Sequence, residues 1–349
     1  MKKAYLHTAF KCNGKSFENE KYLLEFTKVT YPEIHSFLKT WFDESDFIIV
    51  NTSGSTGKPK PVKLKKSMMV NSAKATGVFF DLKPNTTALL CLSTGFIAGK
   101  MMLVRAMTLG WHIDVITSSA NPLAEINKTY DFSAMVPLQL FNSVKNIVKI
   151  KKLIVGGGVV SKELQSKILE LPTKIYATYG MTETITHIAI KPLNRAAGMS
   201  FENNTYHTLP KVKINKDDRN CLIIDAPDVA EQTLITNDIV EIISENQFKW
   251  LGRFDNIVNS GGVKLIPEQI EEKLTKIISK RFFVAGVPDV LLGEILVLVI
   301  EGKPIEINKE RFKQVLSKFE IPKRIYFVDN FKETETNKID RISTMNLVF

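Results

Sequence analysis

The stretch NTSGSTGKPKPV, residues 51 to 62, concentrates groups that could hold a phosphate. Hydroxyl side chains and backbone N–H groups donate hydrogen bonds to phosphate oxygens, and glycines let the backbone approach the ligand closely. Lysine side chains offset the negative charge of the phosphate. The residues of this kind are Ser53, Gly54, Ser55, Thr56, Gly57, Lys58 and Lys60. The segment is therefore a candidate phosphate-binding loop.

This loop does not follow either of the common nucleotide-binding patterns. A Walker A loop, G-x-x-x-x-G-K-[ST], would need a glycine at Thr52 and a hydroxyl residue at Pro59. Gly54 and Gly57 are its only glycines, so the dinucleotide pattern G-x-G-x-x-G is also absent. What remains is a loop suited to a polyphosphate that is gripped and then released, with an ordinary solvated turn as the alternative.

Strands and helices that could position the loop alternate from residue 31 to about residue 180. The expected strands are 46–50, 87–93, 112–117, 131–137, 151–158 and 173–180, and the expected helices are 31–42, 66–80, 99–110, 138–148 and 161–170. Strands that are apolar on both faces and separated by helices indicate a mostly parallel sheet covered by helices. Ligands bind at the carboxyl ends of such strands, where the glycine-bearing turns at 52–58, 156–158 and Gly180 lie.

The pattern changes towards the C-terminus. Short alternating segments beyond residue 190 predict a β-rich section, and a compact α+β unit begins near Arg253. We therefore predict an α/β fold with a large N-terminal domain, residues 1–252, and a small C-terminal domain, residues 253–349. A length of 349 residues agrees with about two domains.

Composition narrows the class of protein. The net charge of +10 keeps nucleic-acid binding open as an alternative, but the lysines are interleaved with acids, which favours a generally basic surface from which anionic substrates would also profit. No apolar run is long enough to span a bilayer, and no secretory signal follows the N-terminal lysines. Three isolated cysteines form neither a disulfide framework nor a metal motif. We expect a cytoplasmic protein that binds neither membrane nor nucleic acid; its oligomeric state is not indicated.

Six segments in order resemble the signature motifs of the adenylate-forming superfamily, which includes acyl- and aryl-CoA synthetases. They are SGSTGKPK at 53–60, VGGG at 155–158, YGMTET at 179–184, ITNDIV at 235–240, LGRFDNIVNSGGVKLIPEQIE at 251–271 and TNKIDR at 336–341. The resemblance implies that a carboxylate attacks the α-phosphate of ATP, and that coenzyme A then displaces AMP from the acyl-adenylate. It also implies a small C-terminal domain that is mobile.

The resemblance assigns roles around the nucleotide. Residues 53–60 would hold the β- and γ-phosphates, and Glu183 would bind Mg²⁺, a hard cation that prefers oxygen ligands. Thr182 would donate a hydrogen bond to the α-phosphate. Tyr179 would stack on adenine, with Gly180 beside it, against the turn of Gly156, Gly157 and Gly158.

Further roles fall in the C-terminal part. Asp238 would accept hydrogen bonds from the ribose hydroxyls, joined by Arg253, and Asp255 matches the hinge residue of the family. Gly261 and Gly262 stand where the family brings a backbone loop near the thiol channel. Lys338 matches the lysine that acts only during adenylation, although Asn337 precedes it where the family usually has glycine.

The acid pocket is less defined. Lys100 and Arg105 lie on an otherwise apolar helix and His187 follows the magnesium motif, so all three are acid-pocket candidates. A cation there suits a substrate with a second carboxylate, and STGFIAGKMMLVRA at 93–106 most resembles o-succinylbenzoate:CoA ligases of menaquinone synthesis. The phosphate loop begins at residue 53, earlier than in most of the family. The alternatives are a ligase for another acid and a nucleotide-binding protein that has lost turnover.

Overall fold

The computed structural model describes residues 6–51, 60–198, 204–334 and 339–349. The chain forms two compact units. The first holds the described residues up to 213 together with 225–234, and the second holds 214–224 and the described residues from 235 onward. The β-rich section expected beyond residue 190 is thus divided between the units. The domain boundary at residues 252 and 253 stays a prediction.

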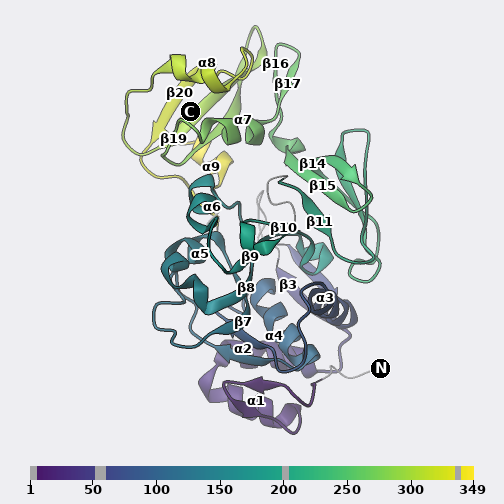
Figure 1. Ribbon diagram of the computed structural model, residues 1–349. Coiled ribbons are helices and arrows are strands. Elements are labelled where there is room, and N and C mark those ends of the chain that lie inside the picture. Colours follow the sequence, from purple (N-terminus) through teal and green to yellow (C-terminus); the bar gives the residue numbers. More distant parts are fainter. Residues whose placement is uncertain (1–5, 52–59, 199–203, 335–338) are drawn as a thin grey trace. The chain divides into compact units, whose positions relative to one another are not determined.

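A mostly parallel sheet is the framework of the first unit (Figure 1). Its strands lie in the order β11-β10-β9-β8-β7-β5-β6-β1-β2, and all pairs from β9 to β1 are parallel. These strands are β1 (Lys11–Cys12), β2 (Lys15–Ser16), β5 (Thr87–Leu90), β6 (His112–Val115), β7 (Tyr130–Met135), β8 (Ile150–Val155), β9 (Lys174–Gly180), β10 (His187–Pro192) and β11 (Tyr206–Thr208). The predicted helix-covered parallel sheet is confirmed.

Helices cover both faces of this sheet. Successive side chains of a strand point to opposite faces, and because these strands are mostly apolar, both faces need to be covered. They are α3 (Lys66–Phe79), α4 (Ile97–Leu109), α5 (Pro137–Ser143) and α6 (Lys162–Ile168). Leu140 of α5 and Leu164 of α6 belong to the core on one face, together with Met135 and Ile175 of the strands. Tyr176, the next residue on β9, points to the other face and belongs to an aromatic cluster with Phe80, Trp111 and Phe132.

The N-terminal region contains elements that the sequence patterns did not predict. Helix α1 (Glu20–Thr30) begins at Asn19, whose side chain accepts hydrogen bonds from the backbone of Lys21 and Tyr22, and it precedes the expected helix α2 (Pro32–Phe42). The expected strand after α2 is β3 (Phe47–Asn51), but it pairs with β4 (Pro61–Lys65) in a separate antiparallel hairpin. This hairpin flanks the candidate phosphate loop in sequence.

The second unit contains two sets of strands. Strands β12 (Lys213–Lys216), β13 (Cys221–Asp225), β14 (Leu234–Ser244) and β15 (Gln247–Arg253) follow one another in order. The others are β16 (Val258–Ser260), β17 (Val263–Leu265), β18 (Phe282–Asp289), β19 (Gly293–Glu301) and β20 (Arg324–Val328). They form a five-stranded sheet in which β19 lies between β16 and β18 and also pairs with β20 in parallel.

Helices pack on both faces of the five-stranded sheet. Helices α7 (Pro267–Leu274) and α8 (Phe312–Val315) contribute Ile270 and Phe312 to one core, and α9 (Arg341–Met345) contributes Met345 to the other. Helix α7 passes into tight turns after Leu274, and α8 stops because Leu316 takes up an extended backbone conformation.

Candidate active site

Two neighbouring strand ends bring the predicted adenine-binding residues to one edge of the sheet. Strand β8 runs into Gly156, Gly157 and Gly158, and β9 ends with Tyr179 and Gly180. Because β8 and β9 are parallel neighbours, their carboxyl ends lie at the same edge. A Cβ on Gly156 would lie 2.6 Å from Thr178 Oγ1, and Gly157 has φ of +80°. The turn therefore requires glycine to follow this path.

The magnesium motif forms a tight and strained turn. A 3-10 turn spans Thr182–Thr184, and the Met181 N–H donates to Thr184 Oγ1 at 3.0 Å. Ile185, only 1% exposed, has φ of +67° and ψ of −65°, and the Thr186 N–H bonds to the Thr184 carbonyl at 2.8 Å. This is a γ-turn of the uncommon, strained kind, which persists only where the surroundings enforce it. The turn fixes the backbone that carries Thr182 and Glu183.

Gly180 allows the chain to return closely after this turn. It stands opposite His187 in the antiparallel β9–β10 pair. A Cβ at this position would lie 2.1 Å from the Thr186 carbonyl oxygen, far inside the normal contact distance. Only a residue without a side chain fits between the two strands here.

Glu183 fits the role of a magnesium ligand in its exposure and donor type. Its side chain is exposed, and no ion pair with another described residue is found for it. Within the described part of the chain, no three His, Cys, Asp or Glu residues gather into a metal site. One carboxylate completed by phosphate oxygens and water is a usual arrangement for Mg²⁺.

Arg105 is a buried cation in the first unit. It is 2% exposed, and its Nε and Nη2 donate to the hydroxyl oxygens of Thr76 and Thr186, each at 3.2 Å. No carboxylate in the described ranges pairs with it. Burial lowers the pKa of Arg105 to about 10, so the side chain remains charged at neutral pH. A buried charge without a counter-ion is costly, which makes this position suited to an anionic ligand.

His187 lies beside this cation and is neutral. Its Nε2 is 3.5 Å from Thr76 Oγ1. Burial, with a further contribution from the charge of Arg105, lowers the pKa of His187 to about 3. The imidazole can therefore serve as a polar hydrogen-bonding group, but not as a second cation.

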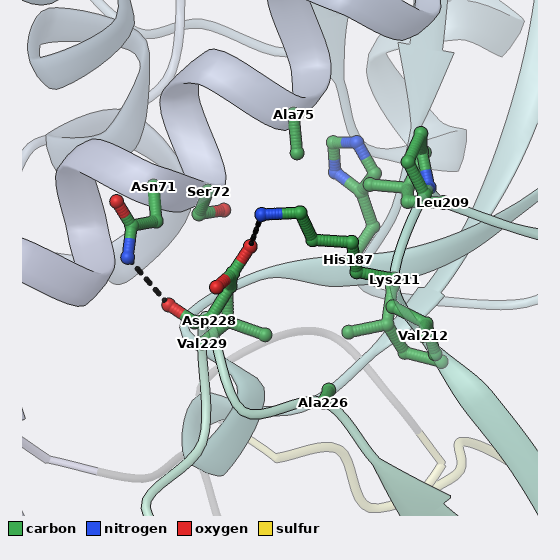
Figure 2. Close-up of a pocket in the computed structure, with 12 residues that line it drawn as sticks. Asn71, Ser72, Ala75, His187, Leu209, Lys211, Val212, Ala226, Asp228 and Val229 are labelled. Atoms are coloured by element: carbon green, nitrogen blue, oxygen red, sulfur yellow. Dashed lines mark hydrogen bonds and ion pairs between the residues drawn. The ribbon is translucent and has the colours of Figure 1, made fainter.

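A small cavity adjoins this cluster (Figure 2). Ser72 and Asn71 of α3 line one side of it and His187 lines another, while Lys211 Nζ pairs with Asp228 Oδ2 at 2.9 Å. The Asn71 side chain donates to the Asp228 carbonyl at 3.0 Å. Arg105 is not among the residues that line the cavity. At about 20 Å³ it has room for roughly one water molecule, so the ring of an aromatic acid would lie outside it.

Lys100 takes a different position from Arg105, although both belong to α4. Its Nζ donates to the carbonyl oxygens of Thr94 at 2.6 Å and Gly95 at 2.8 Å. Burial lowers the pKa of Lys100, and the nearby charge of Glu33 opposes that effect. The ammonium group thus holds the loop before α4.

The second unit brings together the three acidic and basic residues predicted for ribose binding and the hinge. Asp238 on β14 stands opposite Arg253 on β15, with 3.6 Å between Oδ1 and Nη1. The indole N–H of Trp250 donates to Asp238 Oδ1 at 3.0 Å. Arg253 Nη2 also pairs with Asp255 at 2.9 Å, and the Asn237 side chain donates to the same carboxylate at 3.0 Å. These contacts fix both carboxylates against the β14–β15 pair.

The remaining predicted residues are placed as follows. Lys60 is exposed and directly precedes β4. Ser53, Gly54, Ser55, Thr56, Gly57, Lys58 and Lys338 lie outside the described residues. All assigned roles in nucleotide, metal and acid binding stay predictions.

Sequence patterns did not identify the polar residues that contact Arg105, His187 and Asp238. Ser72 and Thr76 lie one turn apart on α3, Ser72 Oγ is 3.1 Å from Thr186 Oγ1, and Trp250 holds Asp238. The i,i+4 spacing of Ser72 and Thr76 on a mainly apolar helix was an available signal. Nothing in the sequence signalled Thr186 or Trp250 as their partners, because those contacts depend on strand register.

The sequence and the fold both match known proteins. The AMP-binding enzyme family matches residues 15–207. The 2-succinylbenzoate–CoA ligase of Staphylococcus epidermidis is 26% identical, with 91% of this chain and 74% of the relative covered. A solved acyl-CoA synthetase (AMP-forming)/AMP-acid ligase II-like protein from Dyadobacter fermentans is 38% identical, with a TM-score of 0.63 and coverage of 94% of this chain and 98% of the other.

The o-succinylbenzoate CoA synthetase MenE of Bacillus subtilis has the same fold. Its complex with the acyl-adenylate intermediate OSB-AMP has a TM-score of 0.75 at 21% identity, covering 84% of this chain and 68% of the other. Its complex with ATP and magnesium has the same TM-score at 18% identity, with 94% and 82% covered. The family match extends over more than half of the sequence, and the match with the Dyadobacter protein covers nearly the full length of both chains. The chain belongs to the AMP-binding enzyme family.

Proposed function

We propose that the protein is an AMP-forming acid:CoA ligase and that its acid is o-succinylbenzoate, a step of menaquinone biosynthesis. Membership of the AMP-binding enzyme family supports the reaction class. The names of the curated relatives and the ligands of the Bacillus subtilis structures support the acid, ATP and magnesium. The names of the curated relatives also include CoA, which supports coenzyme A as the second substrate.

In the first step an oxygen of the substrate carboxylate forms a bond to the α-phosphorus of ATP. The bond from that phosphorus to the bridging oxygen breaks, and pyrophosphate leaves. Bound magnesium would neutralise charge on the phosphates. Thr182 would hold the α-phosphate, Glu183 would hold the metal, and Tyr179 with the turn 156–158 would hold the adenine. The strained turn at Ile185 supports this assignment, because it fixes Thr182 and Glu183 before the substrate arrives.

In the second step the thiolate of coenzyme A forms a bond to the acyl carbon, and AMP leaves with the electrons of the carbon–oxygen bond. Asp238 and Arg253 would keep the nucleotide ribose oriented through both steps. Trp250 supports this role because it holds the Asp238 carboxylate by one oxygen.

The observation that carries the choice of acid is Arg105. It is a fully buried guanidinium for which no carboxylate of the described residues is a partner, and its hydroxyl contacts connect it to the cavity lined by Ser72 and His187. o-Succinylbenzoate carries a second carboxylate beyond the one that reacts. That group would supply the missing negative charge, while an acid with only one carboxylate would leave the cation uncompensated.

The test is AMP release with ATP, magnesium and coenzyme A over a panel of acids, for the wild type and for Arg105→Met. We expect the wild type to prefer o-succinylbenzoate over benzoate and fatty acids. In Arg105→Met the KM for o-succinylbenzoate should rise at least about tenfold, with the KM for ATP unchanged, because a charge-assisted hydrogen bond is worth on the order of 1.5–3 kcal/mol. Preference for a monocarboxylic acid would reject the substrate but keep the reaction class.

A nucleotide-binding protein without turnover is the second candidate. It would bind ATP and release no pyrophosphate with any acid of the panel.

We propose a cytoplasmic location for the ligase, because all three cysteines are buried free thiols. Among the described residues no helix is long and apolar enough to cross a membrane.

A further inference from the structure

The residues on either side of the segment 335–338 are tied together at its base. Glu333 and Ile339 form an isolated antiparallel bridge, and the Asp340 N–H donates to the Lys332 carbonyl at 2.8 Å. Arg281 pairs with Glu333 at 2.5 Å and with Glu301 on β19 at 3.2 Å. The chain therefore enters this segment from a fixed point on the five-stranded sheet.

Arg341 fixes the chain where it leaves the segment. This first residue of α9 donates from Nη2 to Glu271 Oε2 at 2.9 Å and from Nη1 to the Val284 carbonyl at 3.1 Å. Its guanidinium also lies 5.6 Å from the centre of the Phe283 ring. A planar fork with several donors holds one orientation better than a single ammonium group can.

Helix α7 supplies the carboxylates that hold Arg341. Glu271 also accepts the Val284 N–H at 2.8 Å, so both of its oxygens are occupied. Glu268 lies one turn earlier on α7, 3.9 Å from Arg341, and accepts from the Asn256 side chain at 2.5 Å. Asn256 directly follows Asp255, the predicted hinge residue. Helix α7 thus contacts both Asn256, next to the predicted hinge residue, and Arg341, three residues after Lys338.

We propose that Arg341, held by Glu271 and Glu268, is a positioning residue that fixes the approach of Lys338 in the adenylation step. The inference rests on the proposed function, in which Lys338 acts only in that step. Arg341 comes three residues after Lys338 in the sequence, so its anchoring limits where Lys338 can reach. Misplacing a catalytic group by about 1 Å can cost on the order of a hundredfold in rate.

The anchor depends on the charge of Glu271. Burial raises the pKa of Glu271 to about 7, with Glu268 adding to that effect and Arg341 and the Val284 N–H opposing it. These are the groups that face its carboxylate from α7, α9 and β18. Below pH 7 the protonated side chain binds Arg341 more weakly. Adenylation should therefore weaken in that range through this anchor.

The experiment measures each half-reaction separately in the full-length protein. Acid-dependent ATP:pyrophosphate exchange reports adenylation, and conversion of preformed o-succinylbenzoyl-AMP with coenzyme A reports thioester formation. In Glu271→Gln and in Arg341→Lys we expect exchange to fall about tenfold or more while thioester formation changes less than about twofold. The ratio of exchange to thioester formation should rise through pH 7 in the wild type and lose that rise in Glu271→Gln.

Glu320→Gln is the matched control. Glu320 forms an ion pair with Lys273, another residue of α7, at 2.5 Å. The substitution removes this ion pair and leaves the contacts of Arg341 unchanged. Both half-reactions should stay at wild-type rates. Equal losses in both half-reactions, or no loss in either anchor variant, would overturn the positioning role. Absence of exchange in the wild type with every acid would instead overturn the proposed function, and the inference with it.

Discussion

At the scale of single residues, the first unit buries two basic side chains next to one another, one positively charged and one neutral. Arg105 keeps its proton because its pKa remains about 10 even when buried. His187 is neutral because burial and the charge of Arg105 hold its pKa at about 3. One stable positive charge results, with the hydroxyl groups of Thr76 and Thr186 beside it, and such a charge suits an anionic group.

His187 should make the protein less stable in acid. An unfolded histidine takes up a proton near pH 6.5 while folded His187 does not, so the unfolded state binds more protons between about pH 3 and 6.5. Its contribution to stability is complete above pH 6.5 and is lost as the pH falls. Between pH 7.5 and 5 the loss amounts to about 2 kcal/mol. Urea unfolding at both pH values should show a smaller difference for His187→Gln than for the wild type, and equal differences would contradict this.

At the scale of elements, strands β9 and β10 and the turn between them act as one rigid support. The turn holds a left-handed, buried isoleucine, and the strands come together where only glycine fits. Tyr179, Thr182 and Glu183, assigned to the nucleotide and the metal, lie on this support, and the acid-pocket candidate His187 is the first residue of β10. Local strain here is consistent with a site built to keep its geometry without ligand.

Gly180→Ala should destabilise the protein and weaken nucleotide binding together. The new methyl group would lie 2.1 Å from the Thr186 carbonyl, and forcing the strands apart costs about 1–3 kcal/mol. Gly158→Ala is the matched control for stability, since its methyl group would meet Pro137 at an ordinary 3.5 Å. Thermal unfolding measures both variants. A wild-type midpoint for Gly180→Ala would show that the strands can separate at no cost.

The sequence predicted the parallel strands β5, β7 and β8 well because each is mostly apolar and is followed by a helix. It did not predict that β3 would leave that sheet for a hairpin with β4, since strand pairing depends on partners far along the chain. It identified Arg105 and His187 separately as acid-pocket candidates. Thr76, whose hydroxyl contacts both side chains, and Thr186, which accepts from Arg105, come near them only when α3, α4 and β10 pack together.

At the scale of the whole molecule, the residues assigned to catalysis are distributed over two compact units. The turns 156–158 and 182–184 belong to the first, while Asp238, Arg253 and the Arg341 anchor belong to the second. In the proposed reaction the two half-reactions draw on different parts of the second unit. A change in that unit can therefore impair one half-reaction and spare the other.

Lys338→Ala should separate the two half-reactions most clearly. A lysine on a flexible stem can approach the α-phosphate for adenylation and then withdraw. We expect the variant to lose acid-dependent ATP:pyrophosphate exchange by at least about a hundredfold and to form thioester from the preformed adenylate at nearly the wild-type rate. Replacement of Lys332, another lysine close to this segment, serves as the control. Unchanged exchange in Lys338→Ala would remove Lys338 from the mechanism.

The buried guanidinium of Arg105 has a consequence for the protein without its acid. No carboxylate of the described residues pairs with this enclosed cation, and such a charge makes the first unit less stable than its packing would otherwise allow. A dianionic ligand would relieve that burden, and by linkage it would then also slow local opening and attack by proteases. Under the proposed function, the supply of substrate would therefore influence how long each molecule of enzyme survives.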